Sequence, residues 1–341
     1  MHIPKGGIAF FDSGIGGLTV MATCQNYFKN EIFYYYGDNH HAPYGNLSLF
    51  KIKKYVRNAF KKFKRLNVKA VVIACNTVTA ACIEDLRKEF SFPIIGAEPS
   101  VLKAVKMCYN KNVGNNEIKM KETMYSKPIY VLTTRTTYES ERFHELCRKT
   151  RKRYPMCNLR LCACDELAGI IEKNILNEQF DYAPYLPKGE TAAVVLGCTH
   201  YIYIKKKIED FYHCSCFDGN DGIAKRLVYV LRETYKTHTK EDCNNKDDDN
   251  NKGASIEKSG RGNHKAKNIS LYRLSATTFN PHTKKREKLR QNLIKKDKKN
   301  CSHVLQENTE SLLIKRGEND IFFLGKAKRW NAFIYKQMFG F

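Results

Sequence analysis

The chain has 341 residues, with 59 lysines and arginines against 35 aspartates and glutamates, and a formal net charge of +24. Its hydrophobic share of 42% excludes a wholly disordered chain, and no apolar stretch approaches the roughly 18 residues of a membrane-spanning helix. The 13 cysteines are odd in number and irregularly spaced, and no apolar signal segment precedes the first predicted strand. We therefore expect a cytoplasmic protein with free thiols and no membrane partner.

Short apolar segments alternate along the chain with segments of helical periodicity. Strands are predicted at 8–11, 32–36, 70–74, 93–96, 129–133, 193–196, 216–217 and 321–325. Helices are predicted at 18–28, 49–66, 80–90, 99–108, 140–151, 166–179, 203–211, 223–235 and 327–338. This alternation predicts parallel sheets covered by helices on both faces, in two halves that meet near residue 98.

One of the predicted helices is strongly basic. Residues 51–69 hold nine lysines and arginines and no acidic residue. The apolar residues among them recur at helical spacing, which predicts a surface helix with one buried stripe and a solvated basic face. Contact with nucleic acid or with a membrane is the less favoured alternative.

A second basic region, residues 236–316, carries 20 lysines and arginines against 10 acidic residues. Periodic apolar residues are sparse in it, and it contains the polar run 244–252. We expect a mostly disordered insertion inside a domain, because a strand and a helix are predicted after it. Binding of nucleic acid through this insertion is left open.

Polar clusters follow several of the predicted strands. In parallel α/β sheets, ligands bind beyond the carboxyl ends of the strands, so these clusters mark a candidate site. The first cluster, 12–17, is a glycine-rich turn that offers free N–H groups to an anion, but it lacks the GxGxxG and P-loop patterns. A tight turn capped by an aspartate is its plainer interpretation. The other clusters are 36–38, 42–45, 75–77 and 197–200.

Two cysteines, Cys75 and Cys198, end strands of the buried type at corresponding places in the two halves. Each precedes a predicted helix start, where the helix dipole favours a thiolate. If the halves face each other, the two thiols approach one substrate from opposite sides, as the base and the acid must for inversion at a carbon atom. The alternative for any single cysteine is a small buried hydrophobe, and we assign this role to the other eleven.

The spacing of the remaining cysteines and histidines does not favour a metal site. Cys157, Cys162 and Cys164 lack the paired spacing of a structural zinc site. The neighbouring His40 and His41 are a weak signal, since histidines are common in loops. We therefore expect no bound metal.

Taken together, four strings of the chain resemble the motifs of glutamate racemases, in the cofactor-independent aspartate/glutamate racemase family. Their order along the chain, each at or near a strand end, makes the resemblance specific. It covers residues 1–235 and resumes over 319–341. The four strings are 12–17, 43–45, 74–77 and 197–200.

The resemblance implies an α/β fold of two pseudo-symmetric three-layer domains with mainly parallel sheets and the active site in the cleft between them. The first domain would comprise 1–98 plus 214–341, including the insertion at 236–316, and the second would comprise 99–213. The resemblance also implies interconversion of L- and D-glutamate without a cofactor, supplying D-glutamate for peptidoglycan. A homodimer is left open.

Roles for individual residues follow from the same resemblance. Cys75 would remove the α-proton from D-glutamate and Cys198 from L-glutamate, each acting as the acid in the other direction. Asp12 would assist Cys75, and His200 would assist Cys198, while Glu172 matches a further acidic position. The substrate-binding residues would be Asp12, Ser13, Asp38, Tyr44, Gly45, Asn76, Thr77, Thr199 and His200, with Thr134 and Thr137 lining the cleft.

The chain departs from the family at Ile202, where proline is common, and in the insertion, but not at an expected catalytic position. Two other functions stay open at this point. One is an aspartate racemase or another member of the same superfamily, and the other is a basic nucleic-acid-binding protein on the same scaffold. The intact catalytic motifs favour the enzyme.

Overall fold

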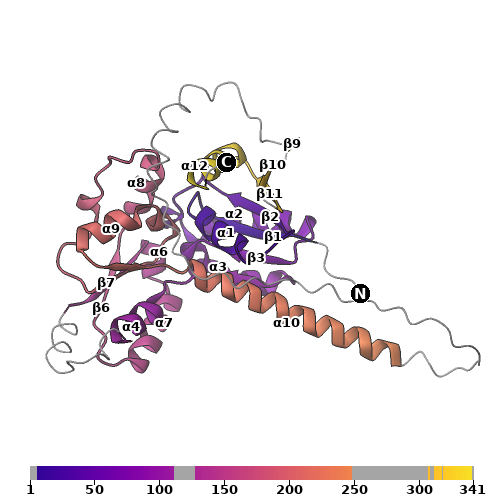
Figure 1. Cartoon of the computed structure of the whole chain (residues 1–341), viewed down its shortest axis with the longest axis horizontal. Helices are drawn as coiled ribbons and strands as arrows, with labels where there is room; N and C mark the ends of the chain where they lie inside the picture. Colours follow the sequence, from indigo (N-terminus) through magenta and orange to yellow (C-terminus); the bar gives the residue numbers. More distant parts are fainter. Residues whose placement is uncertain (1–5, 111–126, 248–305, 308–310, 317, 340–341) are drawn as a thin grey trace, which may run out of the picture.

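The computed structural model describes residues 6–110, 127–247, 306–307, 311–316 and 318–339. Over these residues the chain forms two bodies, each a sheet covered by helices, and helix α10 (Asn220–Asp247) extends away from them (Figure 1). Within the described ranges, no helix is long and apolar enough to cross a membrane.

The larger sheet has seven strands in the order β4-β3-β1-β2-β11-β10-β9. The first five run parallel, and β10 pairs antiparallel with both of its neighbours. Asp12 at the end of β1 lies opposite Gly37 at the end of β2, so the carboxyl ends of these strands share one edge. The strands are β1 (Ile8–Asp12), β2 (Ile32–Gly37), β3 (Ala70–Ile73), β4 (Ile94–Gly96), β9 (Gln306–Glu307), β10 (Ser311–Arg316) and β11 (Asn319–Leu324).

The smaller sheet has four strands, all parallel, in the order β6-β5-β7-β8. Its strands are β5 (Ile129–Thr133), β6 (Leu159–Ala163), β7 (Ala193–Leu196) and β8 (Ser215–Phe217). Together the two sheets confirm the expected α/β fold with mainly parallel sheets.

Helices cover both faces of both sheets. In addition to α10, the described helices are α1 (Gly17–Gln25), η1 (Tyr44–Asn46), α2 (Leu49–Arg65), α3 (Asn76–Glu89), α4 (Val101–Asn110), α6 (Arg135–Tyr138), α7 (Glu141–Arg153), α8 (Leu167–Asn174), η2 (Ala183–Tyr185), η3 (Thr199–Ile204), α9 (Lys205–Tyr212) and α12 (Lys328–Phe339). On the larger sheet, α1, α10 and α12 pack on one face, and α2 and α3 pack on the other. On the smaller sheet, α8, η3 and α9 pack on one face, and α4 and α7 pack on the other.

The central strands are continuous apolar runs because both of their faces are buried. In β1, Ile8 and Phe10 enter the core beneath α1, while Ala9 and Phe11 enter the core beneath α2. This two-sided burial is typical of parallel sheets and explains why β1 lacks polar alternation. The polar residues gather instead at the strand ends, where Asp12 begins the loop to α1.

The structure differs from the sequence predictions at the edges of the sheets. Strand β8, assigned to the first domain by the expected boundary at 213/214, pairs with β7 of the smaller sheet. Strand β6 was not predicted, because its burial is mostly partial and its sequence carries an arginine and a cysteine.

The expected limits of the insertion are also wrong at both ends. Helix α10 continues through residues 236–247, and β9 and β10 add residues 306–307 and 311–316 to the larger sheet. The expected disorder of residues 248–305 lies outside the described residues.

Candidate active site

The ends of strands from both sheets meet where the two bodies face each other. Asp12 ends β1, Cys75 caps α3 after β3, and Cys198 caps η3 after β7. All three side chains are buried, as is His200 in η3. A hydrogen bond joins the two sides directly, because Thr199 Oγ1 donates to Asp12 Oδ2 at 3.1 Å.

The glycine-rich loop after β1 packs closely against the second body. Gly14 N donates to Asp12 Oδ1 at 2.8 Å, which orients the carboxyl group at the strand end. A Cβ atom on Gly16 would lie 2.2 Å from Thr199 Oγ1, so only glycine permits this approach of the loop to η3. Burial raises the pKa of Asp12, and the charge of His200 opposes this effect.

Cys75 lies in a site that favours its protonated form. Its Sγ atom is 3.5 Å from Ser13 Oγ. Burial and then the charge of Asp12 raise the pKa of Cys75 to about 12, with Ser13 opposing. This outcome differs from the expected thiolate at a helix start, because burial outweighs the helix dipole. Cys198 is among the groups that raise this pKa, so the two thiols interact electrostatically.

Cys198 has a charged partner instead. Its Sγ atom lies 3.7 Å from His200 Nδ1, and the opposite ring nitrogen of His200 bonds to a carboxylate oxygen of Glu172. Burial by itself would lower the pKa of His200, but the charge of Glu172 and the hydrogen bonds raise it well above the usual range. Burial likewise would raise the pKa of Glu172, but the charge of His200 and hydrogen bonds hold it below its usual value. The pair is therefore an imidazolium and a carboxylate at neutral pH.

Sequence reasoning missed Asn39, which completes this chain of contacts. Asn39 Nδ2 donates to the second carboxylate oxygen of Glu172, so the loop after β2 in one body contacts α8 in the other. Its position next to Asp38 in a strand-end cluster was the available signal. That signal is weak, because asparagine is common in loops.

The predicted substrate-binding residues form two further groups. Thr77, Thr134 and Thr137 form a buried hydroxyl cluster, with Oγ1 atoms 2.9 Å apart for Thr77 and Thr134 and 3.2 Å apart for Thr134 and Thr137. This cluster joins α3 of the first body to α6 of the second. Gly45 lies beside it, since its carbonyl oxygen accepts a hydrogen bond from Thr136 at 3.3 Å.

Asp38 contacts Tyr44 and His41 and makes no hydrogen bond to either thiol among the described contacts. Its carboxylate accepts a hydrogen bond from Tyr44 Oη at 2.6 Å and also contacts His41 Nδ1 at 2.9 Å. Tyr44 itself is buried. The structure thus gives Asp38 a part in fixing Tyr44 and the loop that carries Gly45.

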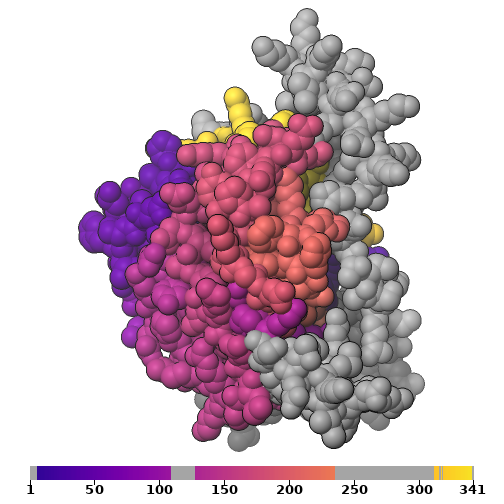
Figure 2. All heavy atoms as spheres, turned by 90° about the vertical axis from the view of Figure 1, so that its left-hand side faces the viewer, coloured from indigo at the N-terminus to yellow at the C-terminus, as the bar shows by residue number. Residues whose placement is uncertain are grey.

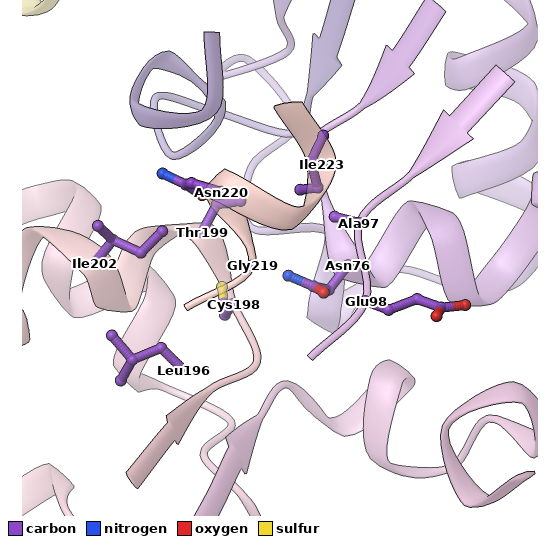
Figure 3. Close-up of a pocket in the computed structure, with 10 residues that line it drawn as sticks. All are labelled: Asn76, Ala97, Glu98, Leu196, Cys198, Thr199, Ile202, Gly219, Asn220 and Ile223. Atoms are coloured by element: carbon purple, nitrogen blue, oxygen red, sulfur yellow. The ribbon is translucent and has the colours of Figure 1, made fainter. Parts of the chain in front are cut away.

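A small pocket opens at the junction of the two bodies, and Cys198 and Asn76 lie within it (Figure 3). Asn76 Oδ1 is buried without a hydrogen-bond partner among the described residues, so it can accept a hydrogen bond from a substrate ammonium group. The pocket is lined by Asn76, Ala97, Glu98, Leu196, Cys198, Thr199, Ile202, Gly219, Asn220 and Ile223. In the described part of the chain, no three His, Cys, Asp or Glu side chains cluster as a metal site would require.

Two α/β bodies face each other, and each places a buried cysteine directly after the end of a strand. The Asp/Glu/Hydantoin racemase family model matches residues 22–227. The chain is 35% identical over 241 residues to glutamate racemase 2 of Bacillus subtilis, covering 66% of this chain and 82% of that protein. It is 39% identical over 241 residues to the glutamate racemase of Clostridium novyi, covering 68% and 85%. The chain therefore belongs to the aspartate/glutamate racemase family.

Solved structures share the fold. The glutamate racemase of Francisella tularensis in complex with D-glutamate superposes with a TM-score of 0.52 at 27% identity, covering 68% of this chain and 83% of that chain. Glutamate racemase RacE1 of Bacillus anthracis gives a TM-score of 0.53 at 23% identity, covering 68% and 84%.

Proposed function

We propose that this racemase interconverts L- and D-glutamate by two-base proton transfer between Cys75 and Cys198. The observation that carries the proposal is the pair of buried thiols, one after a strand end of each sheet, with Ser13 Oγ 3.5 Å from one and His200 Nδ1 3.7 Å from the other. The named relatives, all glutamate racemases, support glutamate as the substrate. The D-glutamate bound by the Francisella protein supports the same choice.

For L-glutamate, the reaction begins with Cys198 as thiolate and Cys75 as thiol. Cys198 takes the α-proton and becomes a thiol, while Cys75 gives its proton to the opposite face of the α-carbon and becomes a thiolate. The protonated His200 stabilises the thiolate of Cys198 in the starting state by charge. D-glutamate reacts by the same steps in reverse, starting from the opposite protonation states.

Substrate binding uses groups around the two thiols. The backbone N–H groups at the start of α3, near Asn76 and Thr77, can bind a carboxylate of the substrate. The ammonium group can be bound by Asn76 Oδ1 and the Asp12 carboxylate. Because the thiols and Asp12 are buried, the closed cleft excludes water from the carbanionic transition state.

The first test is racemisation in deuterated water. L-glutamate should yield D-glutamate that carries deuterium at the α-carbon, without added cofactor or metal. A parallel assay with L-aspartate, using chiral chromatography, tests aspartate as the alternative substrate. Turnover of aspartate in preference to glutamate would contradict the proposal. The cellular role that this activity supports is production of D-glutamate in the cytoplasm for the synthesis of peptidoglycan.

A further inference from the structure

Helix α2 presents a straight basic row to solvent. Its opposite side, which includes Ile52, Val56 and Phe63, is buried in the core beside the larger sheet. The violet part of the chain that includes α2 forms the left-hand edge of the molecule in Figure 2. The exposed row recurs at helical spacing and consists of Phe50, Lys54, Arg57, Lys61, Lys64 and Arg65.

Most of this charge is not neutralised within the protein. Two acidic residues of α3 form ion pairs with α2, each at 2.7 Å: Asp85 with Lys53 beside the row, and Glu89 with Arg57 in the row. Lys54, Lys61, Lys64 and Arg65 make no ion pair with any residue that the structure describes. From Lys54 to Arg65 the row spans about 16 Å, at the helical rise per residue.

Two large apolar side chains stand at the amino-terminal end of the row. Phe50 is 76% exposed and Leu49 is 54% exposed, the former being the most exposed large hydrophobic residue in the described part of the chain. Neither contributes to the core, although both lie at the start of a helix whose other apolar residues are buried. An exposed apolar pair beside unneutralised lysines calls for a surface that is both anionic and apolar.

We infer that the exposed face of α2 binds the surface of an anionic phospholipid bilayer. Lysine and arginine side chains would contact the lipid phosphates, while Phe50 and Leu49 would enter the boundary between headgroups and acyl chains. This peripheral contact differs from membrane spanning and revises the expectation of no membrane partner.

Nucleic acid fits this face less well than a bilayer does. Binding of single strands relies on exposed aromatic side chains interleaved with basic ones. Within the length of the row, Phe60 and Phe63 are buried, and Tyr55 is stacked on His41, with ring centroids 3.8 Å apart. Phe50 lies at the end of the row rather than within it.

The test is sedimentation of the full-length protein with phosphatidylcholine vesicles that contain either no anionic lipid or 30% phosphatidylglycerol, a composition of roughly physiological surface charge. Binding is expected only to the anionic vesicles and should weaken steeply with salt. The triple variant Lys54→Glu, Lys61→Glu, Lys64→Glu should bind at least about a hundredfold more weakly, since each basic residue near such a surface contributes roughly fivefold. Phe50→Ser, which leaves the net charge unchanged, should lower the affinity for anionic vesicles roughly tenfold.

The matched control is Lys106→Glu, Lys152→Glu, Arg153→Glu, which changes net charge equally on exposed positions of α4 and α7. Its affinity for the vesicles should stay within about threefold of the wild type, a difference that reflects only the change in net charge of the whole protein. Circular dichroism and racemase activity should be unchanged in all three variants, because none of these residues contacts the thiols. Equal loss of vesicle binding in both triple variants would overturn the inference. It would also be overturned if the wild type bound duplex DNA or RNA but no vesicles, and the α2 triple variant lost that nucleic-acid binding.

Discussion

The surroundings of Cys75 and Cys198 differ more than the matching positions of the two residues suggest. At Cys75, burial and the carboxylate of Asp12 raise the pKa to about 12, so the thiol keeps its proton at neutral pH. At Cys198, the hydrogen-bonding partner is His200, whose positive charge is maintained by Glu172. Both bodies place a cysteine after a strand end, and the neighbouring side chains give the two thiols different electrostatic surroundings.

Removal of either thiol should have the largest effect. Cys75→Ala and Cys198→Ala should each lower racemisation by at least about a thousandfold, the scale of a lost acid or base. Because enantiomers have equal free energies, kcat/KM is equal for both directions in every variant, and only kcat and deuterium uptake can report a difference between the two sides. Residual α-deuteration should favour L-glutamate in Cys75→Ala and D-glutamate in Cys198→Ala.

Cys82→Ala is the matched control, because Cys82 is a buried cysteine of α3 that faces the core. It should keep full catalytic activity. Near-normal racemisation by either thiol variant would contradict the two-base proposal.

The comparison also shows what the sequence could and could not predict. The central strands were predictable because apolar runs such as Ala70–Ile73 are buried on both faces. Strand β10 was not predictable, because it follows a lysine- and asparagine-rich region and only its pairing with β11 in the folded chain defines it as a strand. The position of Cys75 was predictable from the motif, but its protonation depends on burial and on Asp12, which only the folded chain brings together.

Glu172→Gln should have the next largest effect, because it removes the charge that keeps His200 protonated. We expect kcat to fall by about a hundredfold, the scale of a lost charged hydrogen bond. In the wild type, kcat should stay constant as the pH rises past 6.5, the ordinary pKa of histidine. In the variant, the decrease of kcat at alkaline pH should begin at a lower pH. Glu166→Gln, an exposed neighbour at the start of α8, should leave the profile unchanged.

The same pair should stabilise the fold within a defined pH window. The folded-state pKa of Glu172 is lowered, so its contribution is complete above its usual 4.5 and is lost as pH falls through the lowered value. The folded-state pKa of His200 is raised, so its contribution is complete below its usual 6.5 and is lost as pH rises through the raised value. Urea unfolding should therefore show Glu172→Gln less stable by about 2 kcal/mol between these limits and by less outside them. A difference independent of pH would contradict the ion pair.

Asn39→Ala should have the smallest effect and tests how far the Cys198 side extends. The variant removes the donor to the second oxygen of Glu172, so the carboxylate is less firmly held against His200. We expect kcat to fall by about tenfold with KM almost unchanged, since Asn39 contacts Glu172 and not one of the proposed substrate-binding residues. Asn39→Thr, which keeps a donor, should recover part of the loss, and the exposed Asn58→Ala should match the wild type. Because this contact joins the loop after β2 to α8, a loss of kcat would mean that the base at Cys198 depends on how the two bodies meet, whereas Cys75 and its partners Asp12 and Ser13 lie within one body.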